Sequence, residues 1–194
     1  MALYGGIDLG GTKIQAVVID SERAADHGVV GQARRRTPHS GGPRAVTREL
    51  DATLREAAAQ AGVEPTRLRG VGVGSPGEVD SSAGTVAHAG NLPDWQGTFA
   101  LAEELSHALG GTPVRLGNDV GVATRAELEI GAGRGARSLL GVFWGTGVGG
   151  GLALEGRLWR GRGGAGEIGH TVVRLNGAHC PCGRRGCMEA YAGR

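Results

Sequence analysis

The stretch LYGGIDLGGTKIQAVVID, residues 3–20, decides the fold. Its apolar composition favours one strand over Leu3–Asp8 and a second over Lys13–Asp20. The pair Gly10 and Gly11 between them predicts a tight turn, because glycine adopts backbone conformations that side chains forbid. The stretch therefore predicts a hairpin whose turn presents backbone N–H groups to an anion.

The rest of the chain alternates predicted strands and helices. In residues 43–61, for example, Val46, Leu50, Leu54 and Ala57 recur every three or four residues, which is helical spacing. Further strands are expected at Val29–Thr37, Leu68–Gly74, Pro113–Leu116, Ser138–Trp144 and Leu152–Leu154, and helices at Pro43–Ala61, Phe99–Leu109 and Asp119–Ile130. This alternation indicates an α/β fold.

A second glycine-rich segment, GTGVGGG at residues 145–151, also joins an apolar strand to another strand. Its backbone N–H groups could line an anion site, as those of the first hairpin could. In the first hairpin Thr12 adds a hydroxyl, Lys13 a cation, and Asp8 a carboxylate that can hold Mg²⁺ through water. The first hairpin can also be a turn and nothing more. Two such hairpins, each opening half of the chain, predict two related lobes that face a phosphate cleft.

All three cysteines of the chain lie in CPCGRRGC, residues 180–187, ten residues after His170. Three thiolates and an imidazole form a closed tetrahedral zinc site of the structural kind. The expected ligands are His170, Cys180, Cys182 and Cys187. Because Glu167 and Glu189 flank these ligands, a bound zinc ion would also fix two carboxylates for binding.

The cysteine segment permits alternatives to this ligand set. His179 could replace His170 as the fourth ligand, although its place beside Cys180 makes simultaneous chelation awkward. A disulfide between Cys180 and Cys182 would be strained, and the odd number of cysteines also argues against a disulfide framework. The thiols could also be free residues of a core.

Composition sets broad limits on function. The formal net charge of +2 favours neither nucleic acid nor membrane as a partner. The run Arg34–Arg36 is a local exception that a solvated strand or turn would explain. No apolar run is long enough to span a bilayer, and the N-terminus lacks the pattern of a secretory leader. We therefore expect a reducing, cytoplasmic setting, with no nucleic-acid or membrane partner.

Two further segments carry polar residues with chemical potential. Asn118 and Asp119 follow a short strand, where the Asp could be a helix cap or the general base that phosphoryl transfer needs. Asn91 lies in a loop that also contains Trp95. Amides and carboxylates, including those of the segment 167–189, suit a polyhydroxylated ligand because they engage neighbouring hydroxyls in fixed geometry.

Taken together, these motifs closely resemble the ROK family of repressors, open reading frames and sugar kinases. The resemblance rests on DLGGTK at residues 8–13, GSPG at 74–77, ND at 118–119, ExGH at 167–170 and CxCGxxGCxE at 180–189. It covers essentially the whole chain in the family's order. It implies the α/β actin-like ATPase fold, which is ribonuclease H-like, with residues 1–118 as the N-terminal lobe. Residues 119–194 would form an incomplete C-terminal lobe that carries the second hairpin and the zinc knuckle.

The resemblance also implies roles for individual residues. Asp119 would be the catalytic base that deprotonates the sugar hydroxyl, and the cofactors would be ATP, Mg²⁺ and a structural Zn²⁺. ATP would be bound by Asp8, Gly10, Gly11, Thr12, Lys13, Gly145, Thr146, Gly147, Gly149 and Gly150. The sugar would be bound by Asn91, Asn118, Asp119, Glu167, His170 and Glu189, and zinc by His170, Cys180, Cys182 and Cys187.

The function that the resemblance implies is an ATP-dependent hexose kinase, with glucose converted to glucose 6-phosphate. The alternatives are a non-catalytic sugar-binding remnant and a sugar-sensing regulator without its DNA-binding domain. Because the first strand begins at Leu3, we expect no DNA-binding domain before it. Family members usually extend beyond the length of this chain, so we expect the adenine pocket to be missing and phosphorylation to be poor. A full-length form is expected to be a homo-oligomer, either a dimer or a tetramer.

Overall fold

The computed structural model describes residues 2–23, 28–145 and 147–193. The chain divides into two compact units, unit 1 (Met1–Asp119) and unit 2 (Val120–Arg194). The assignment of two functional lobes, divided between residues 118 and 119, stays a prediction. Thr146, an expected ATP contact, lies outside the described residues.

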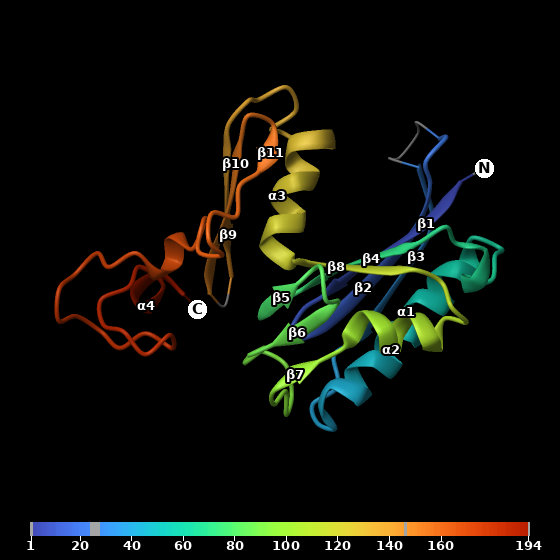
Figure 1. Ribbon diagram of the computed structural model, residues 1–194, viewed down its shortest axis with the longest axis horizontal. Coiled ribbons are helices and arrows are strands. Elements are labelled where there is room, and N and C mark those ends of the chain that lie inside the picture. Colours follow the sequence, from blue (N-terminus) through green and yellow to red (C-terminus); the bar gives the residue numbers. More distant parts are fainter. Residues whose placement is uncertain (1, 24–27, 146, 194) are drawn as a thin grey trace. The chain divides into compact units, whose positions relative to one another are not determined.

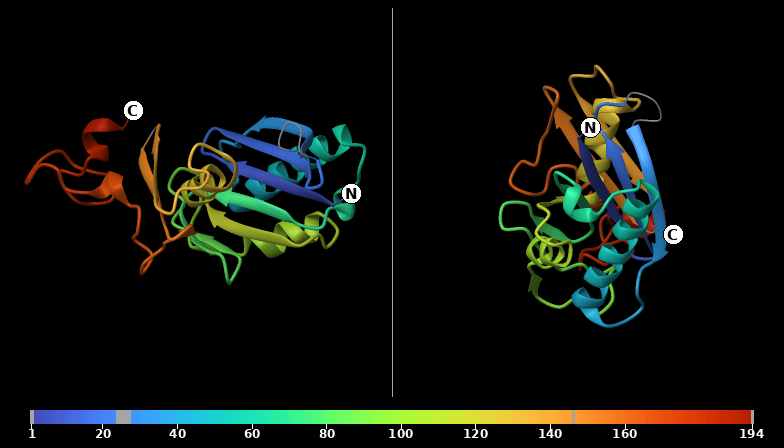
Figure 2. Two further views of the ribbon diagram at one scale, coloured as in Figure 1. Left: turned by 90° about the horizontal axis from the view of Figure 1, so that it is seen from above. Right: turned by 90° about the vertical axis from the view of Figure 1, so that its right-hand side faces the viewer.

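Unit 1 is built on a five-stranded sheet of order β3-β2-β1-β4-β8, whose strands lie side by side in Figure 2. The strands are β1 (Leu3–Leu9), β2 (Lys13–Asp20), β3 (Val29–Arg36), β4 (Val71–Ser75) and β8 (Val114–Asn118). The first three are antiparallel, whereas β4 is parallel to both β1 and β8. The predicted hairpin of β1 and β2 is therefore present, and its turn comprises residues 10–12.

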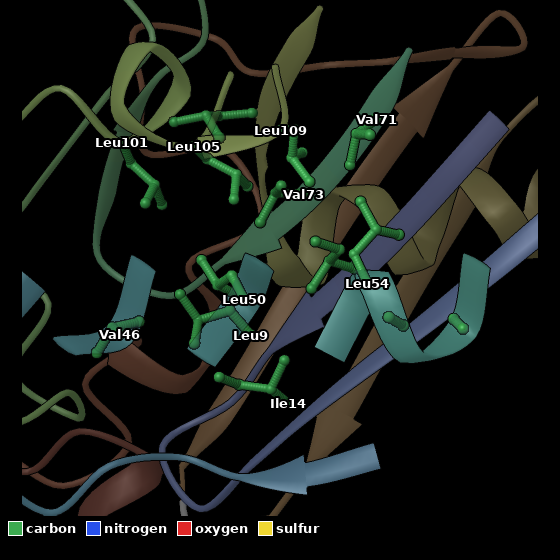
Figure 3. Packing of buried hydrophobic residues seen from close by; sticks show 14 of the residues in the cluster. Leu9, Ile14, Val46, Leu50, Leu54, Val71, Val73, Leu101, Leu105 and Leu109 are labelled. Carbon is green, nitrogen blue, oxygen red and sulfur yellow. The ribbon is translucent and has the colours of Figure 1, made fainter. Parts of the chain in front are cut away.

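Helices α1 (Gly42–Gln60) and α2 (Leu101–Ala108) pack against this sheet (Figure 1). Parallel strands require such crossover connections. Leu50 and Leu54 of α1 are fully buried with Leu9 and Ile14 of the hairpin (Figure 3). The apolar residues that recur with helical spacing in the sequence are thus the residues that α1 buries in the core.

Unit 1 also contains a small antiparallel sheet that the sequence did not predict. It comprises β5 (Glu78–Asp80), β6 (Thr85–Ala87) and β7 (Thr98–Phe99). The indole N–H of buried Trp95 donates to the carbonyl of Val86 at 3.2 Å, and the ring packs edge-on against Phe99 at 5.7 Å. This anchoring fixes the loop that precedes Trp95, in which Asn91 lies. A short 3₁₀ helix, η2 (Pro65–Arg67), precedes β4.

Unit 2 is built on a three-stranded antiparallel sheet of order β11-β10-β9. The strands are β9 (Leu139–Trp144), β10 (Val148–Leu154) and β11 (Arg157–Leu158), and the helical elements are α3 (Asp119–Ile130), η3 (Ile168–His170) and α4 (Glu189–Ala192). Thr124 of α3 lies directly on the sheet: a Cβ at Gly141 or Gly151 would come within 2.5 or 2.0 Å of its Oγ1. Glycine is therefore needed at both positions for α3 to pack.

The second glycine-rich segment differs from the expectation. Strand β10 begins at Val148, so Gly149 and Gly150 pair with β9 instead of lying in a loop. A Cβ at Gly149 would lie 2.7 Å from the side chain of Val120, and one at Gly150 would lie 2.4 Å from the carbonyl oxygen of Gly166. These glycines thus permit close packing in a strand, and the turn itself is shorter than predicted.

Candidate functional site

Two hydrogen bonds from Thr37 hold the turn of the first hairpin in place. Its hydroxyl donates to the carbonyl of Gly10 at 2.6 Å and its backbone N–H donates to the carbonyl of Thr12 at 3.2 Å. The Gly10 N–H donates to the carbonyl of Lys13 at 3.0 Å. Within the described residues, the N–H groups of Gly11 and Thr12 make no hydrogen bond, so they are available to an anion.

Asn91, an expected sugar contact, lies against this turn. A Cβ at Gly11 would come within 2.7 Å of the Asn91 carbonyl oxygen, so only glycine fits there without a shift. Asn91 itself is exposed, while Leu92 and Trp95 in the same loop are buried. The loop is therefore anchored by its apolar residues and presents its amide residue beside the hairpin.

Asp8, Asn118 and Asp119 lie at the ends of strands that flank β4. Burial of part of the Asp8 carboxyl raises its pKa, the nearby Asp119 carboxylate raises it further, and Lys13 opposes the rise. The Asn118 amide donates to Asp119 Oδ1 at 3.1 Å. Asp119 is also the first residue of α3, where the helix dipole favours a negative charge. Two carboxylates and a lysine therefore share this edge of unit 1.

The turn of the second hairpin lies against Glu189, another expected sugar contact. The Val148 backbone N–H donates to Glu189 Oε2 at 2.8 Å, and a Cβ at Gly147 would come within 2.5 Å of that same oxygen. Gly145 N–H closes the turn by donating to the Gly147 carbonyl at 3.0 Å. Each hairpin thus has, within its own unit, a predicted sugar residue packed against a predicted phosphate residue.

The knuckle brings together the four residues predicted to bind metal. The ligand atoms of His170, Cys180, Cys182 and Cys187 all lie within 4.8 Å of one another. Cys180 Sγ is 3.5 Å from His170 Nδ1, and Cys182 Sγ is 3.7 Å from Cys187 Sγ. A tetrahedron with Zn–S bonds of about 2.3 Å has sulfur atoms about 3.8 Å apart, so the arrangement fits zinc. All three cysteines are free, as the sequence indicated.

The two candidate histidines face different neighbours. His170 directs Nδ1 to Cys180, whereas its Nε2 lies 4.0 Å from a carboxylate oxygen of Glu167. His179 Nε2 instead lies 2.6 Å from the guanidinium of Arg185. This geometry favours His170 as the fourth ligand and leaves one of its ring nitrogens beside Glu167.

The environments of two thiols differ in ways that matter for metal binding. Hydrogen bonds from the backbone and side chain of Arg184 lower the pKa of Cys182 to about 6. Burial raises the pKa of Cys187 to about 11. Thiolates are the metal-binding form of cysteine. The lowered pKa of Cys182 favours its thiolate before metal binds, whereas Cys187 would release its proton as the metal binds.

The structure thus groups the predicted residues within each unit. Unit 1 brings together Asp8, the first hairpin, Asn91, Asn118 and Asp119, and unit 2 brings together the second hairpin, Glu167, His170, Glu189 and the cysteines. Sequence reasoning missed Thr37, which locks the first hairpin. Its position directly after β3, opposite the start of β2, is the feature that could have indicated this role.

The β3-β2-β1-β4-β8 sheet, with a glycine-rich turn between β1 and β2 and helices on its crossovers, defines the actin-like ATPase class of α/β fold. In the part of the chain that is described, no helix is both long and apolar enough to cross a bilayer.

The chain belongs to the ROK family, whose sequence profile matches residues 4–194. It is 37% identical over 188 residues to a glucokinase of Thermotoga maritima, covering 96% of this chain and 56% of that protein. An N-acetyl-D-glucosamine kinase of Pectobacterium carotovorum is 35% identical over 200 residues. That match covers 97% of this chain and 62% of the kinase. The chain therefore spans little more than half the length of these curated relatives.

Solved structures of ROK kinases also match nearly the whole of this chain. A ROK hexokinase from Thermus thermophilus superposes with a TM-score of 0.80 at 38% identity, covering 98% of this chain and 60% of that one. A ROK glucokinase from Streptomyces griseus, solved in complex with glucose and AMPPNP, superposes with a TM-score of 0.82 at 34% identity, covering 99% and 57%.

Proposed function

We propose that the protein is an ATP-dependent sugar kinase that transfers the γ-phosphoryl group of ATP to a hexose hydroxyl, with glucose as the expected acceptor. The kinase names of the relatives support this proposal, as does the glucose and AMPPNP complex of the Streptomyces griseus relative. The chain itself contributes both glycine-rich hairpins and the polar residues that pack against them.

The observation that carries the proposal is the position of Asp119 beside Asn118 and close enough to Asp8 to affect its pKa. Phosphoryl transfer needs a base to accept the proton of the attacking hydroxyl and a cationic or N–H-rich site for the phosphates. Asp119 is the proposed base. The Gly11 and Thr12 N–H groups and the Lys13 ammonium are the proposed phosphate contacts in unit 1.

The bound ions would have separate roles. Asp8 is the carboxylate that would hold Mg²⁺ through water, and the ion would neutralise charge on the transferred phosphoryl group. The knuckle residues would hold Zn²⁺ as a structural ion. Zinc binding would fix Glu189, two residues after Cys187, and His170 beside Glu167, which are the proposed sugar contacts of unit 2.

The identity of the hexose is the finer part of the proposal. Carboxylates and amides that bind vicinal hydroxyls suit glucose, but the relatives include a kinase of N-acetyl-D-glucosamine. Turnover should therefore be compared with both sugars. A higher kcat/KM for N-acetyl-D-glucosamine would replace glucose as the substrate while leaving the kinase proposal in place.

The test of the kinase proposal is Asp119→Ala in the whole protein, assayed by coupled release of ADP. We expect kcat to fall roughly 10²- to 10⁴-fold, as for loss of a general base, with sugar affinity largely kept. Asp51→Ala, an equal change of charge at a partly exposed position of α1 whose carboxylate pairs with Arg55, is the control and should leave kcat unchanged. A near-normal kcat for Asp119→Ala would reduce Asp119 to a helix-terminal residue.

A further inference from the structure

Strand pairing places a row of charged residues on one face of the unit 1 sheet. Directly paired residues point to the same face of a sheet. Asp8 pairs with Gln15 and Gln15 with Arg34, while Lys13 pairs with Arg36. The row therefore runs from the carboxylate of β1 across β2 to two arginines of edge strand β3.

The intervening Arg35 provides an internal contrast. It points to the opposite face, where its guanidinium pairs with Glu49 and Glu56 of α1. Arg34 and Arg36 are exposed, and within the described residues neither forms an ion pair. Two uncompensated guanidinium groups therefore lie on the face that carries Lys13.

These cations also border a hollow. A depression of about 420 Å³ is lined by Thr12, Lys13, Arg34 and Arg36, and also by Arg35, whose guanidinium lies with α1 on the other face. It thus begins at the turn whose Gly11 and Thr12 N–H groups are available to an anion and continues onto β3. Arginine suits phosphate because its planar fork donates two parallel hydrogen bonds.

We propose that Arg34 and Arg36 extend the first hairpin into a binding site for a condensed phosphate chain, either the triphosphate of a nucleotide or inorganic polyphosphate. Adjacent strands lie about 4.8 Å apart, so the site from β1 to β3 is about 10 Å wide, more than one phosphate group occupies. The acidic end at Asp8 would take the accompanying cation and the arginine end the chain of phosphates. The inference rests on the proposed function only in taking the first hairpin as a phosphate site.

The test is binding of inorganic tripolyphosphate to the 194-residue chain, measured by calorimetry at constant ionic strength without sugar. In Arg34→Gln/Arg36→Gln we expect the Kd to rise about tenfold or more, because two charge-assisted contacts are lost. The matched control is Arg67→Gln/Arg69→Gln, which removes the same charge at the opposite end of β1, where Arg69 N–H donates to the Leu3 carbonyl. That variant should bind as the unchanged chain does.

Each outcome bears on the site. Equal Kd values for both double variants, or equal affinity of the unchanged chain for orthophosphate and tripolyphosphate, would overturn the extended site. Repeating the titration with ATP and with long-chain polyphosphate identifies the source of the phosphate chain. If Arg34→Gln/Arg36→Gln loses affinity for polyphosphate alone, the arginines bind a chain longer than a triphosphate. If it loses affinity for both equally, they bind the triphosphate of the nucleotide. Because no sugar is present, failure here leaves the Asp119 assay of the kinase proposal unaffected.

Discussion

Units 1 and 2 differ in where their apolar side chains lie. The hydrophobic core formed by α1, α2 and the five-stranded sheet belongs wholly to unit 1. Most of the large apolar side chains that are exposed belong to unit 2, namely Val122, Ile130, Leu140, Val142, Trp144, Leu154, Trp159, Val172, Val173, Leu175 and Tyr191. Burial of apolar surface, the usual main source of stability, therefore supports unit 1 far more than unit 2.

Unit 2 relies instead on close backbone packing and on the knuckle. A Cβ at Gly169 would come within 1.9 Å of the Val148 carbonyl oxygen, and one at Gly186 within 1.7 Å of that of Arg174. We therefore expect that a zinc ion, if bound by the knuckle as proposed, would contribute more to the order of unit 2 than its small core does.

Loss of the metal site is expected to have the largest effect. We predict that Cys187→Ser removes the buried ligand and much of a zinc-binding free energy on the order of 10–16 kcal/mol. Amide protection, measured by hydrogen exchange and mass spectrometry, should fall across residues 166–193 and persist in α1. Restoration of protection in a chelated wild-type chain on adding zinc is the control. Protection of the knuckle that survives Cys187→Ser would show that unit 2 is ordered without the ion.

The same Leu→Ala substitution should affect the stability of the two units very differently. Leu54 of α1 is fully buried, whereas Leu140 of β9 is half exposed. We expect Leu54→Ala to lower the free energy of unfolding of unit 1 by about 2–5 kcal/mol. Leu140→Ala should change stability by less than about 0.5 kcal/mol. Denaturant titrations of both variants provide the measurement, and similar losses would mean that the exposed face of β9 is covered in solution.

A methyl group in the second hairpin should disturb the link to the knuckle. In Gly147→Ala the new Cβ would meet Glu189 Oε2, so the carboxylate must move at a cost of roughly 1–3 kcal/mol. The Val148 amide should then exchange faster, and sugar affinity in the whole protein should fall. Gly145→Ala is the matched control, because a Cβ there meets no atom within 4 Å. Equal exchange rates in both variants would show that Glu189 is free to adjust.

The smallest effect concerns the carboxylate pair of unit 1. Replacing Asp119 by Asn removes a negative neighbour, so the pKa of Asp8 should fall toward its ordinary value, as followed by NMR titration. The sign of the linked effect follows, since a carboxyl with a raised folded pKa opposes folding once ionised. Its contribution lowers stability as pH rises from the unfolded to the folded pKa of Asp8. An unchanged Asp8 pKa would show that burial alone raises it.

The sequence predicted the parts of the fold in which a pattern repeats over many residues. The β1–β2 hairpin and the Leu50 and Leu54 face of α1 were recognisable because burial repeats along them. The β5–β6–β7 sheet was not, since strands of two or three residues contain no measurable alternation. The start of β10 at Val148 was also missed, because glycines that allow helix packing cannot be told in sequence from glycines that form a turn.

The candidate site shows the same division. The cysteine spacing predicted a group of ligands that the structure brings together, because knuckle geometry is set by local turns such as that at Gly183. The contact between Glu189 and Val148 was not predictable, since 41 residues separate the two along the chain. Neither was the contrast between Arg34 and Arg35, which depends on the register of β3 against β2 and on the position of α1.

The placement of the tryptophans makes the two units optically distinct. Trp95 is buried in unit 1, with 8% of its surface exposed, whereas Trp144 and Trp159 of unit 2 are 65% and 54% exposed. Indole emission shifts to longer wavelength in water, so only Trp95 has far to shift when the chain unfolds. A fluorescence melting curve of this protein would therefore record the unfolding of unit 1 almost alone, and unit 2 could lose its order with little shift of the emission wavelength.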